Sequence, residues 1–203
     1  MRMPPPVQWC LPVILLLGSG QALAQDVERR GFIGLGIGPS VPYGSFADAS
    51  SANVRAGHAT SGYTNTLLNL GYRFGRRLGV AAALSYSEYP SRDGGDDDWW
   101  QVAGVTVGPL YSVRLNARTA VDLKAMVGLM VLTPVVDGFT TGDGIGTGPA
   151  VDLRAAVRYD VFTRWALFAE GGLQSSRVSF DTGVRTDYRA MISSFGIAFR
   201  PAW

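Results

Sequence analysis

The chain has few of the residues on which metal sites and catalytic centres usually depend. Its 203 residues include one cysteine, Cys10, and one histidine, His58. Because there is no second cysteine, no disulfide can form within the chain. No zinc-ligand spacing, nucleophile elbow or pair of catalytic carboxylates accompanies the histidine. The sequence therefore predicts neither an enzyme nor a protein with a cofactor.

Long hydrophobic runs and a strong net charge are missing as well. The longest apolar stretch after the N-terminal region, residues 125–136, contains Pro134 and is bounded by Lys124 and Asp137. It is shorter than the roughly 20 apolar residues of a transmembrane helix. The formal net charge is only +2, and no cluster of Lys and Arg indicates binding to nucleic acid.

The first 24 residues have the features of a cleaved secretory signal peptide. Arg2 gives a positive start, an apolar stretch follows over residues 11–18, and Ala22-Leu23-Ala24 forms a small-residue cleavage site. A membrane anchor is the alternative, but the apolar stretch is too short to cross a bilayer. Cys10 precedes that stretch, whereas the acylated cysteine of a lipoprotein would follow it. We expect residues 1–24 to be removed and residues 25–203 to form one domain.

Alternation of apolar with polar or small residues predicts eight β-strands. In the clearest of them, Val121 and Leu123 share one face while Asp122 and Lys124 share the other. The predicted strands are residues 31–42, 62–75, 78–89, 99–115, 119–133, 149–160, 164–178 and 188–203. Strands that satisfy every backbone amide in lipid must close into a barrel, and bacterial single-chain barrels have an even number of strands. The predicted fold is all-β, an eight-stranded antiparallel up-and-down transmembrane β-barrel.

The connections and the C-terminal residues predict how this barrel is oriented. Residues 75–77, 116–119 and 160–164 are short turns, which we assign to a periplasmic rim. The longer segments, rich in Gly, Ser, Asp and Thr, are expected to face the outside of the cell; they are residues 43–61, 90–98, 134–148 and 179–187. The last nine residues alternate and end on Trp203, as the closing strand of an outer-membrane barrel does.

Aromatic residues gather near the predicted strand ends. Seven lie near the turns with the parity of the outward faces, and we expect them to form a girdle at the lipid–water boundary. These are Tyr72, Phe74, Tyr111, Tyr159, Trp165, Phe199 and Trp203. Six others near the opposite strand ends are candidates for an outer girdle, namely Tyr43, Tyr63, Tyr86, Trp99, Trp100 and Tyr188.

The inward faces of the predicted strands carry charged residues. They are Arg73, Arg114, Asp122, Lys124, Asp152, Arg154, Arg158, Glu170 and Arg200, six cations and three anions. An eight-stranded barrel has an interior that side chains can fill, and the inward apolar residues expected to help are Leu67, Leu110, Met126, Met130 and Phe168. One interpretation is an ion-paired plug, completed by loop carboxylates, water or a bound anion. The alternative is a narrow polar conduit or small-anion site.

Three further patterns resemble functional sites. Gly34, Gly36 and Gly38 resemble a nucleotide loop, but Pro39 follows and no helix opens there. A loop carboxylate cluster that includes Asp96, Asp97 and Asp98 could bind a divalent cation, although it lacks the spacing of a calcium loop. Outer-membrane lipases place a His and a Ser on a lipid-facing strand, and His58 with Ser61 does not match that placement.

The pattern of the whole chain after residue 24 resembles the small eight-stranded outer-membrane β-barrel proteins of the OmpA/OmpX-like superfamily. Residues 31–46 are similar to the first strand and loop of generic members, although Pro201 departs from the usual terminal signal. The resemblance implies a location in the outer membrane of a Gram-negative bacterium. It also implies lipid and lipopolysaccharide as partners, and recognition of the last strand by the barrel-assembly machinery. We expect no peptidoglycan-binding domain after the barrel, and we expect a monomer.

Two classes of function are compatible with these features. The first is a structural or surface-interaction protein that displays four outer loops for adhesion, host contact or envelope integrity. The second is a minor transport or small-anion-binding channel that uses the charged lumen. A soluble lipocalin-like barrel has the same number of strands, but its apolar rows would point inward.

Overall fold

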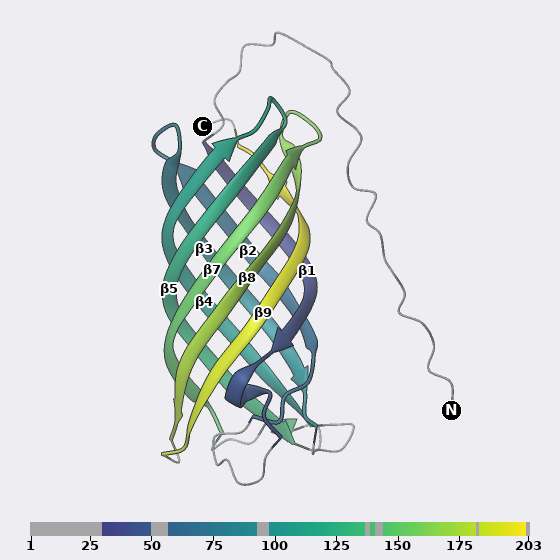
Figure 1. Cartoon of the computed structure of the whole chain (residues 1–203), viewed down its shortest axis with the longest axis vertical. Helices are drawn as coiled ribbons and strands as arrows, with labels where there is room; N and C mark the ends of the chain where they lie inside the picture. Colours follow the sequence, from purple (N-terminus) through teal and green to yellow (C-terminus); the bar gives the residue numbers. More distant parts are fainter. Residues whose placement is uncertain are drawn as a thin grey trace, which may run out of the picture.

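The computed structural model describes residues 30–49, 57–92, 98–136, 139–140, 144–181 and 183–201 (Figure 1). Residues 1–24, the predicted signal peptide, and Trp203 lie outside these ranges. Eight long strands and one two-residue strand make up most of the described chain. They are β1 (Gly31–Pro42), β2 (Gly62–Arg73), β3 (Leu78–Pro90), β4 (Trp99–Arg114), β5 (Thr119–Val136), β6 (Phe139–Thr140), β7 (Gly146–Asp160), β8 (Trp165–Phe180) and β9 (Arg185–Phe199).

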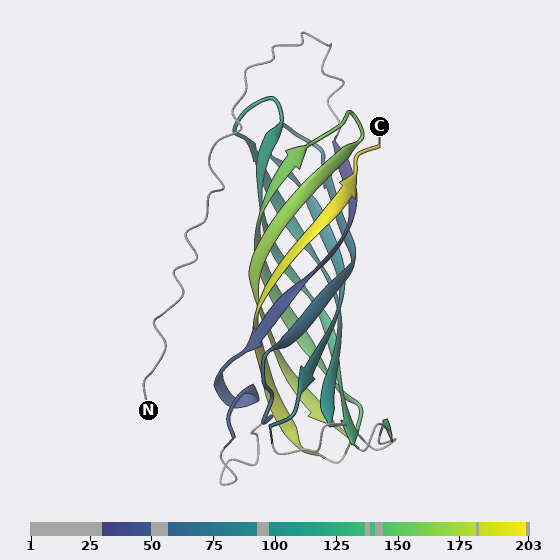
Figure 2. The same cartoon turned by 90° about the vertical axis from the view of Figure 1, so that its right-hand side faces the viewer.

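The eight long strands close into an antiparallel barrel, as the sequence predicts. Each pairs with its neighbour along the chain, and β6 adds only a short pairing with the end of β5. The ring is completed where β1 meets β9, with Ile33 opposite Phe199 and Val41 opposite Met191. Figure 2 shows this seam, with the yellow β9 beside the purple β1. A closed ring leaves no long strand with an unpaired edge.

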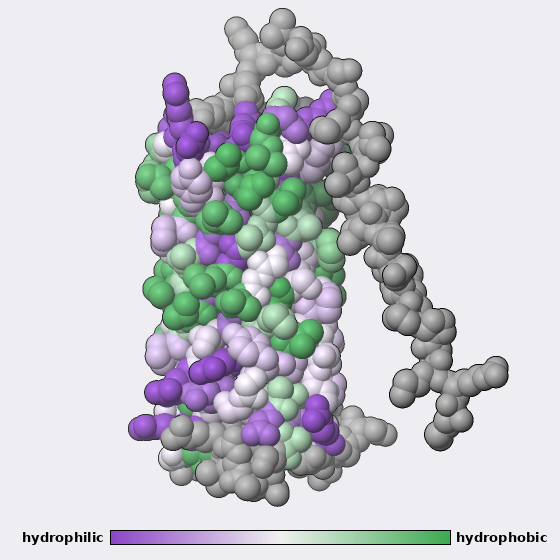
Figure 3. Space-filling model, viewed as in Figure 1, coloured by the Kyte–Doolittle hydropathy of each residue, from purple (hydrophilic) through white to green (hydrophobic). Residues whose placement is uncertain are grey.

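The two faces of the barrel wall are inverted relative to a soluble protein. Along β7, Val151, Leu153 and Val157 are exposed, whereas Asp152 and Arg154 between them are buried. The other long strands alternate in the same way, with a period of two residues, except where a bulge interrupts β2 between Thr66 and Leu68. In Figure 3 hydrophobic side chains cover much of the middle and upper parts of the outer surface. The apolar rows therefore point outward, which is opposite to the arrangement of a lipocalin-like barrel.

Glycines on the inner wall make room for one large ring. Phe168 of β8 points into the barrel, and a Cβ added at Gly36 or Gly196 would lie 3.0 or 2.5 Å from its ring. Both glycines belong to the β1–β9 seam, where they pair with each other. The glycines at positions 34, 36 and 38 thus lie within a strand and line the core, in agreement with rejecting a nucleotide loop.

Short turns gather at one end of the barrel, the upper end in Figures 1 and 2. We call this the turn end, and β1 begins and β9 ends there. The turn after β4 is held by Asn116, whose side-chain oxygen accepts hydrogen bonds from the backbone N–H groups of Arg118 and Thr119 at 2.9 and 2.8 Å. The opposite loop end carries the 3₁₀-helix η1 (Gly44–Phe46). No helix in the described ranges is long and apolar enough to cross a membrane.

Several strands extend further toward the loop end than the sequence predicts. β8 and β9 continue their pairing to Ser179 and Arg185, so the predicted long loop 179–187 is mostly a tight hairpin. β5 continues through Pro134, at the point where its partner changes from β7 to β6. A proline is tolerated there because a strand edge needs no N–H donor. At the turn end, β9 stops at Phe199 rather than continuing through residue 203.

Candidate functional site

Four charged side chains form a buried network in the middle of the barrel. We call Lys124, Asp152, Arg154 and Glu170 the central ion network. Arg154 Nη1 lies 2.9 Å from Glu170 Oε1, and Lys124 Nζ pairs with the other oxygen of the same carboxylate. Arg154 also donates to Asp152, with Nε 2.8 Å from Oδ1 and Nη2 2.6 Å from Oδ2. All four side chains are at most 2% exposed, and their charges balance as two cations and two anions.

The central ion network reaches the opposite wall of the barrel. Lys124 Nζ donates to Asn69 Oδ1 of β2 at 2.9 Å, and Arg154 Nη1 lies 3.5 Å from Thr66 Oγ1 of the same strand. In the order of strands around the ring, β2 is directly across from β7, which carries Arg154. Side chains therefore span the full width of the lumen at this level.

Neutral side chains continue this network toward the loop end. Gln174 Nε2 donates to Asp152 Oδ2 at 3.1 Å, and the Tyr188 hydroxyl donates to Gln174 Oε1 at 3.1 Å. Tyr188 and Tyr89 share a hydrogen bond of 2.9 Å, and Tyr89 contacts Ser40 Oγ at 2.5 Å. A buried chain of hydrogen bonds thus connects the ions with the mouth of the barrel.

Two more ion pairs lie between the central ion network and the turn end. Arg158 Nη1 is 2.7 Å from Asp122 Oδ2, and Arg200 pairs with Asp160. The Arg158 guanidinium also lies over the Phe32 ring, 4.7 Å from its centroid. The Asp160 carboxylate is one that sequence reasoning missed, because its position at the end of a strand looked like part of a turn. Asp160 supplies the fourth anion among these inward charges.

Two residues predicted to face the lumen are placed elsewhere. Arg114 has inward parity, but it lies at the last position of β4 and is exposed, so its assignment to a buried network is wrong. Leu67 is 50% exposed on the outer surface. A β-bulge between Thr66 and Leu68 inserts one extra residue into β2 and reverses the parity on which the prediction rested. Arg73 is buried, and its Nη1 lies 3.4 Å from the Arg76 carbonyl oxygen.

Aromatic side chains gather inside the barrel at the loop end. Phe46, carried by η1, is fully buried and contacts Tyr188, Tyr89 and Trp100, with ring centroids 5.0, 5.4 and 5.9 Å away. We call these four residues the aromatic cap. The Trp100 indole N–H donates to the Gly57 carbonyl oxygen at 2.7 Å, which holds the first loop over the mouth. Tyr188 was predicted for an outer girdle, yet it is fully buried because its position on β9 points inward.

The structure places the described members of the predicted turn-end girdle on the outer face. Tyr72, Tyr111, Tyr159 and Trp165 are 37–47% exposed and Phe74 is 63% exposed. Phe199 packs edge-on against Trp165, with ring centroids 5.3 Å apart.

Of the candidate cation ligands, Asp96 and Asp97 lie outside the described residues, while Asp98 precedes β4. The described chain contains no group of three side chains that could hold a metal ion.

Comparisons with known proteins support the fold. No protein-family model and no curated protein matches the sequence, so membership of the OmpA/OmpX-like superfamily stays a prediction. Among solved structures, the chain is similar to Neisserial surface protein A, with 14% identity, a TM-score of 0.61, and coverage of 84% of this chain and 97% of the other. It is also similar to the attachment invasion locus protein Ail of Yersinia pestis in complex with the heparin analogue sucrose octasulfate. That match has 16% identity, a TM-score of 0.50, and coverage of 85% and 98%.

Proposed function

We propose that this chain is an integral outer-membrane β-barrel protein of a Gram-negative bacterium with a structural or surface-interaction role. The observation that carries the proposal is the inverted wall, with apolar rows exposed on the outside and ion pairs buried inside. Exposed apolar area of this extent is stable in lipid and unfavourable in water. The similarity in fold to Neisserial surface protein A and to Ail agrees with this location.

The lumen of the proposed protein is closed. The aromatic cap fills the mouth, and the central ion network spans the middle of the barrel. A dry, ion-paired interior offers no continuous path to a solute, which argues against the alternative of a small-anion channel. Catalysis is not part of the proposal. Interaction with partners is therefore assigned to the loop end.

The orientation and partners belong to the same proposal. The turn end faces the periplasm, which places the end of β9 where the barrel-assembly machinery meets the closing strand. The predicted signal peptide, residues 1–24, directs export, and the barrel acts as a monomer. Lipopolysaccharide surrounds the loop end, where Arg177, Arg185 and Arg189 lie exposed on the outer faces of β8 and β9. The described residues of the first loop and of η1 contribute to the displayed surface.

Refolding and conductance test this proposal. The chain without residues 1–24, folded in detergent, should migrate differently on gels before and after boiling and give a circular dichroism spectrum dominated by β-structure. In planar bilayers it should show conductance near zero. A helical spectrum or a failure to insert into phosphatidylcholine vesicles would reject the barrel in a membrane. Steady ion conductance by the wild type would instead favour the channel.

A further inference from the structure

The two ends of the barrel differ in charge. At the turn end, six arginines are exposed, namely Arg30, Arg76, Arg77, Arg114, Arg118 and Arg164. The described carboxylates at this end, Asp122 and Asp160, are engaged by Arg158 and Arg200 inside the barrel. The described part of the loop end carries both signs, because Asp181 and Asp187 accompany Arg177, Arg185 and Arg189, and Arg177 Nε lies 2.9 Å from Asp187 Oδ1. The turn end is therefore a rim of positive charge.

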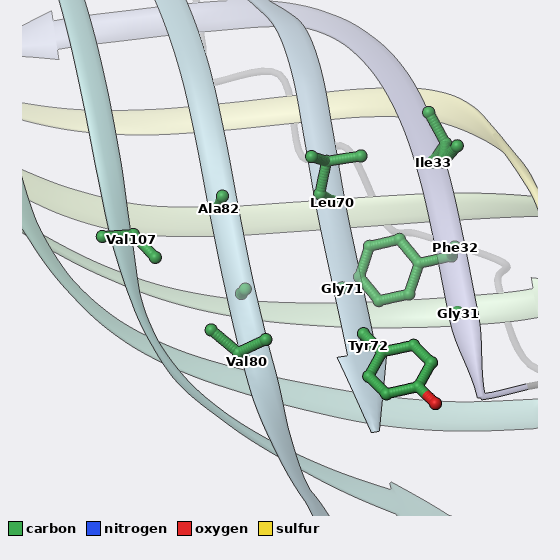
Figure 4. A pocket seen from close by; sticks show the side chains of 10 residues that line it. Gly31, Phe32, Ile33, Leu70, Gly71, Tyr72, Val80, Ala82 and Val107 are labelled. Atoms are coloured by element: carbon green, nitrogen blue, oxygen red, sulfur yellow. The ribbon is translucent and has the colours of Figure 1, made fainter. Parts of the chain in front are cut away.

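An apolar hollow lies on the outer wall just below this rim. It has a volume of about 350 Å³ and is lined by residues of β1, β2, β3 and β4. Figure 4 shows Ile33, Leu70, Tyr72, Val80 and Val107 around it, with the Phe32 ring between the ribbons of β1 and β2. All of its lining side chains are apolar except for the Tyr72 hydroxyl.

A small outward residue opens the hollow. Ala82, the outward residue of β3 between Val80 and Leu84, leaves a gap in the apolar row. Gly71 is an inward position, and a Cβ added there would lie 2.2 Å from the buried Phe32 ring, which therefore fills the wall behind the gap. The longer side chains around Ala82 form the sides of a groove.

The groove and the positive rim belong to the same hairpin. Tyr72 borders the hollow and precedes the turn between β2 and β3, which contains Arg76 and Arg77. Arg30 lies beside this turn, because its carbonyl oxygen accepts a hydrogen bond of 2.8 Å from the Arg73 N–H. Arg77 Nη1 lies 3.3 Å from the hydroxyl of Tyr111, a predicted girdle residue. At 3.3 Å per strand residue, the guanidinium groups of Arg76 and Arg77 therefore lie about 10–15 Å from the apolar groove.

We propose that this groove binds one anionic phospholipid of the leaflet at the turn end. An acyl chain lies in the hollow between β1 and β4, and the headgroup phosphate is bound by Arg76 and Arg77, with Arg30 nearby. The site combines apolar area for the chain with positive charge at headgroup level, which is the combination that distinguishes an anionic lipid from a zwitterionic one. The inference rests on the proposed function, since it requires the barrel wall to contact lipid.

Native mass spectrometry of the folded protein in a nonionic detergent tests the site. The protein is mixed with equal amounts of phosphatidylglycerol and phosphatidylcholine that have the same acyl chains. We expect the wild type to retain phosphatidylglycerol with a preference of about thirtyfold, because each arginine near an anionic lipid contributes about fivefold. Arg76→Gln with Arg77→Gln should abolish the preference, whereas Arg76→Lys with Arg77→Lys should keep most of it.

A second pair of variants separates the groove from the charge. Ala82→Leu fills the hollow and should reduce the retention of both lipids by a similar factor, while Ala155→Leu on the far wall should change neither. Arg185→Gln with Arg189→Gln at the loop end serves as the charge control and should keep the preference. Equal retention of both lipids by the wild type, or loss of the preference in the loop-end control, would overturn the inference.

Vesicle insertion and lipid retention together distinguish failure of the lipid site from failure of the proposed function. A barrel that inserts into phosphatidylcholine vesicles, shows the heat-dependent gel shift and yet has no headgroup preference would leave the proposed function intact and reject the lipid site. A chain that does not insert at all would reject both. Displacement of phosphatidylglycerol by a second copy of the chain, detected as a dimer that Ala82→Leu abolishes, would assign the groove to self-association instead.

Discussion

Replacing Glu170 by glutamine tests the central ion network most directly. The Glu170 carboxylate accepts hydrogen bonds from Lys124 and Arg154, and Asn69 Nδ2 lies 3.5 Å away. Glutamine has nearly the same volume, so packing is preserved while the negative charge is lost. Arg154 keeps its two oxygens on Asp152, whereas Lys124 is left with neutral neighbours, namely the glutamine amide, Asn69 Oδ1 at 2.9 Å and the Phe32 ring centroid at 5.6 Å. The loss of stability therefore comes mainly from the charge of Lys124.

The expected magnitude follows from this distribution of partners. Removing one member of a buried ion pair typically destabilises a protein by about 3–5 kcal/mol. Because Arg154 remains paired, we expect a loss close to the lower limit, about 3 kcal/mol. Glu88→Gln is the matched control, since Glu88 is a half-buried carboxylate at the loop end that accepts a 2.6 Å hydrogen bond from Tyr86. Its loss should cost no more than about 1 kcal/mol.

A double variant distinguishes charge imbalance from general disturbance. Glu170→Gln combined with Lys124→Met removes both members of the pair and leaves Arg154 balanced by Asp152. Buried pairs replaced by apolar groups of similar volume are often nearly neutral, so most of the stability should return. Urea unfolding in detergent micelles, followed by tryptophan fluorescence and the gel shift, measures all four proteins. Conductance of Glu170→Gln in planar bilayers should also rise above the wild-type level. A single variant as stable as wild type, or a double variant no better than the single, would refute the network as described.

Two other variants address the outer wall and the aromatic cap. Leu123→Arg and Leu153→Arg, each at a residue 47% exposed on the outer surface, should destabilise the barrel by about 2–4 kcal/mol in lipid vesicles. Ser179→Arg at the exposed loop end is the control and should cost at most about 1 kcal/mol; equal tolerance at all three positions would mean that the wall does not face lipid. Phe46→Ala should cost about 3–5 kcal/mol because it empties the centre of the cap. It should also increase the quenching of tryptophan fluorescence by a soluble quencher, and an unchanged quenching curve would show that the cap does not seal the mouth.

The fold was largely predictable because a strand with two different environments has a period of two. Exposed and buried positions alternate without exception from Val151 to Arg158, with Ala155 outward and Ala156 inward as their neighbours predict. The prediction of inward and outward faces failed where an extra residue in a strand shifted the alternation. The bulge at Leu67 has no sequence marker, because both neighbours are ordinary strand residues. Every position of β2 up to Leu67 therefore faces the side opposite to the one that counting back from Arg73 predicts.

The aromatic cap was beyond the sequence for a different reason. Parity indicates which face a residue occupies, but it does not give the height of a strand end relative to a loop. The girdle prediction for Tyr188 and Trp100 rested on their places near strand ends and ignored their inward parity; the structure packs both against Phe46 of the first loop. The contact joins segments separated by more than 50 residues. Asp160 was overlooked in the same way, since its partner Arg200 comes from the far end of the chain.

The ion pairs also select a register that alternation alone leaves open. A one-residue slip between strands would move charges onto the outer surface, so the apolar pattern already excludes it. A slip of two residues keeps every side chain on its face, but it shifts partners by about 6.8 Å along the strand. That shift would separate Asp122 of β5 from Arg158 of β7, and Glu170 of β8 from Arg154 of β7, beyond the reach of an ion pair. Arg158 would then lie inside the barrel without its partner Asp122, and Arg154 would keep only Asp152 of its own strand. The buried charges therefore favour one closure of the barrel over its near neighbours, whatever they add to the total stability.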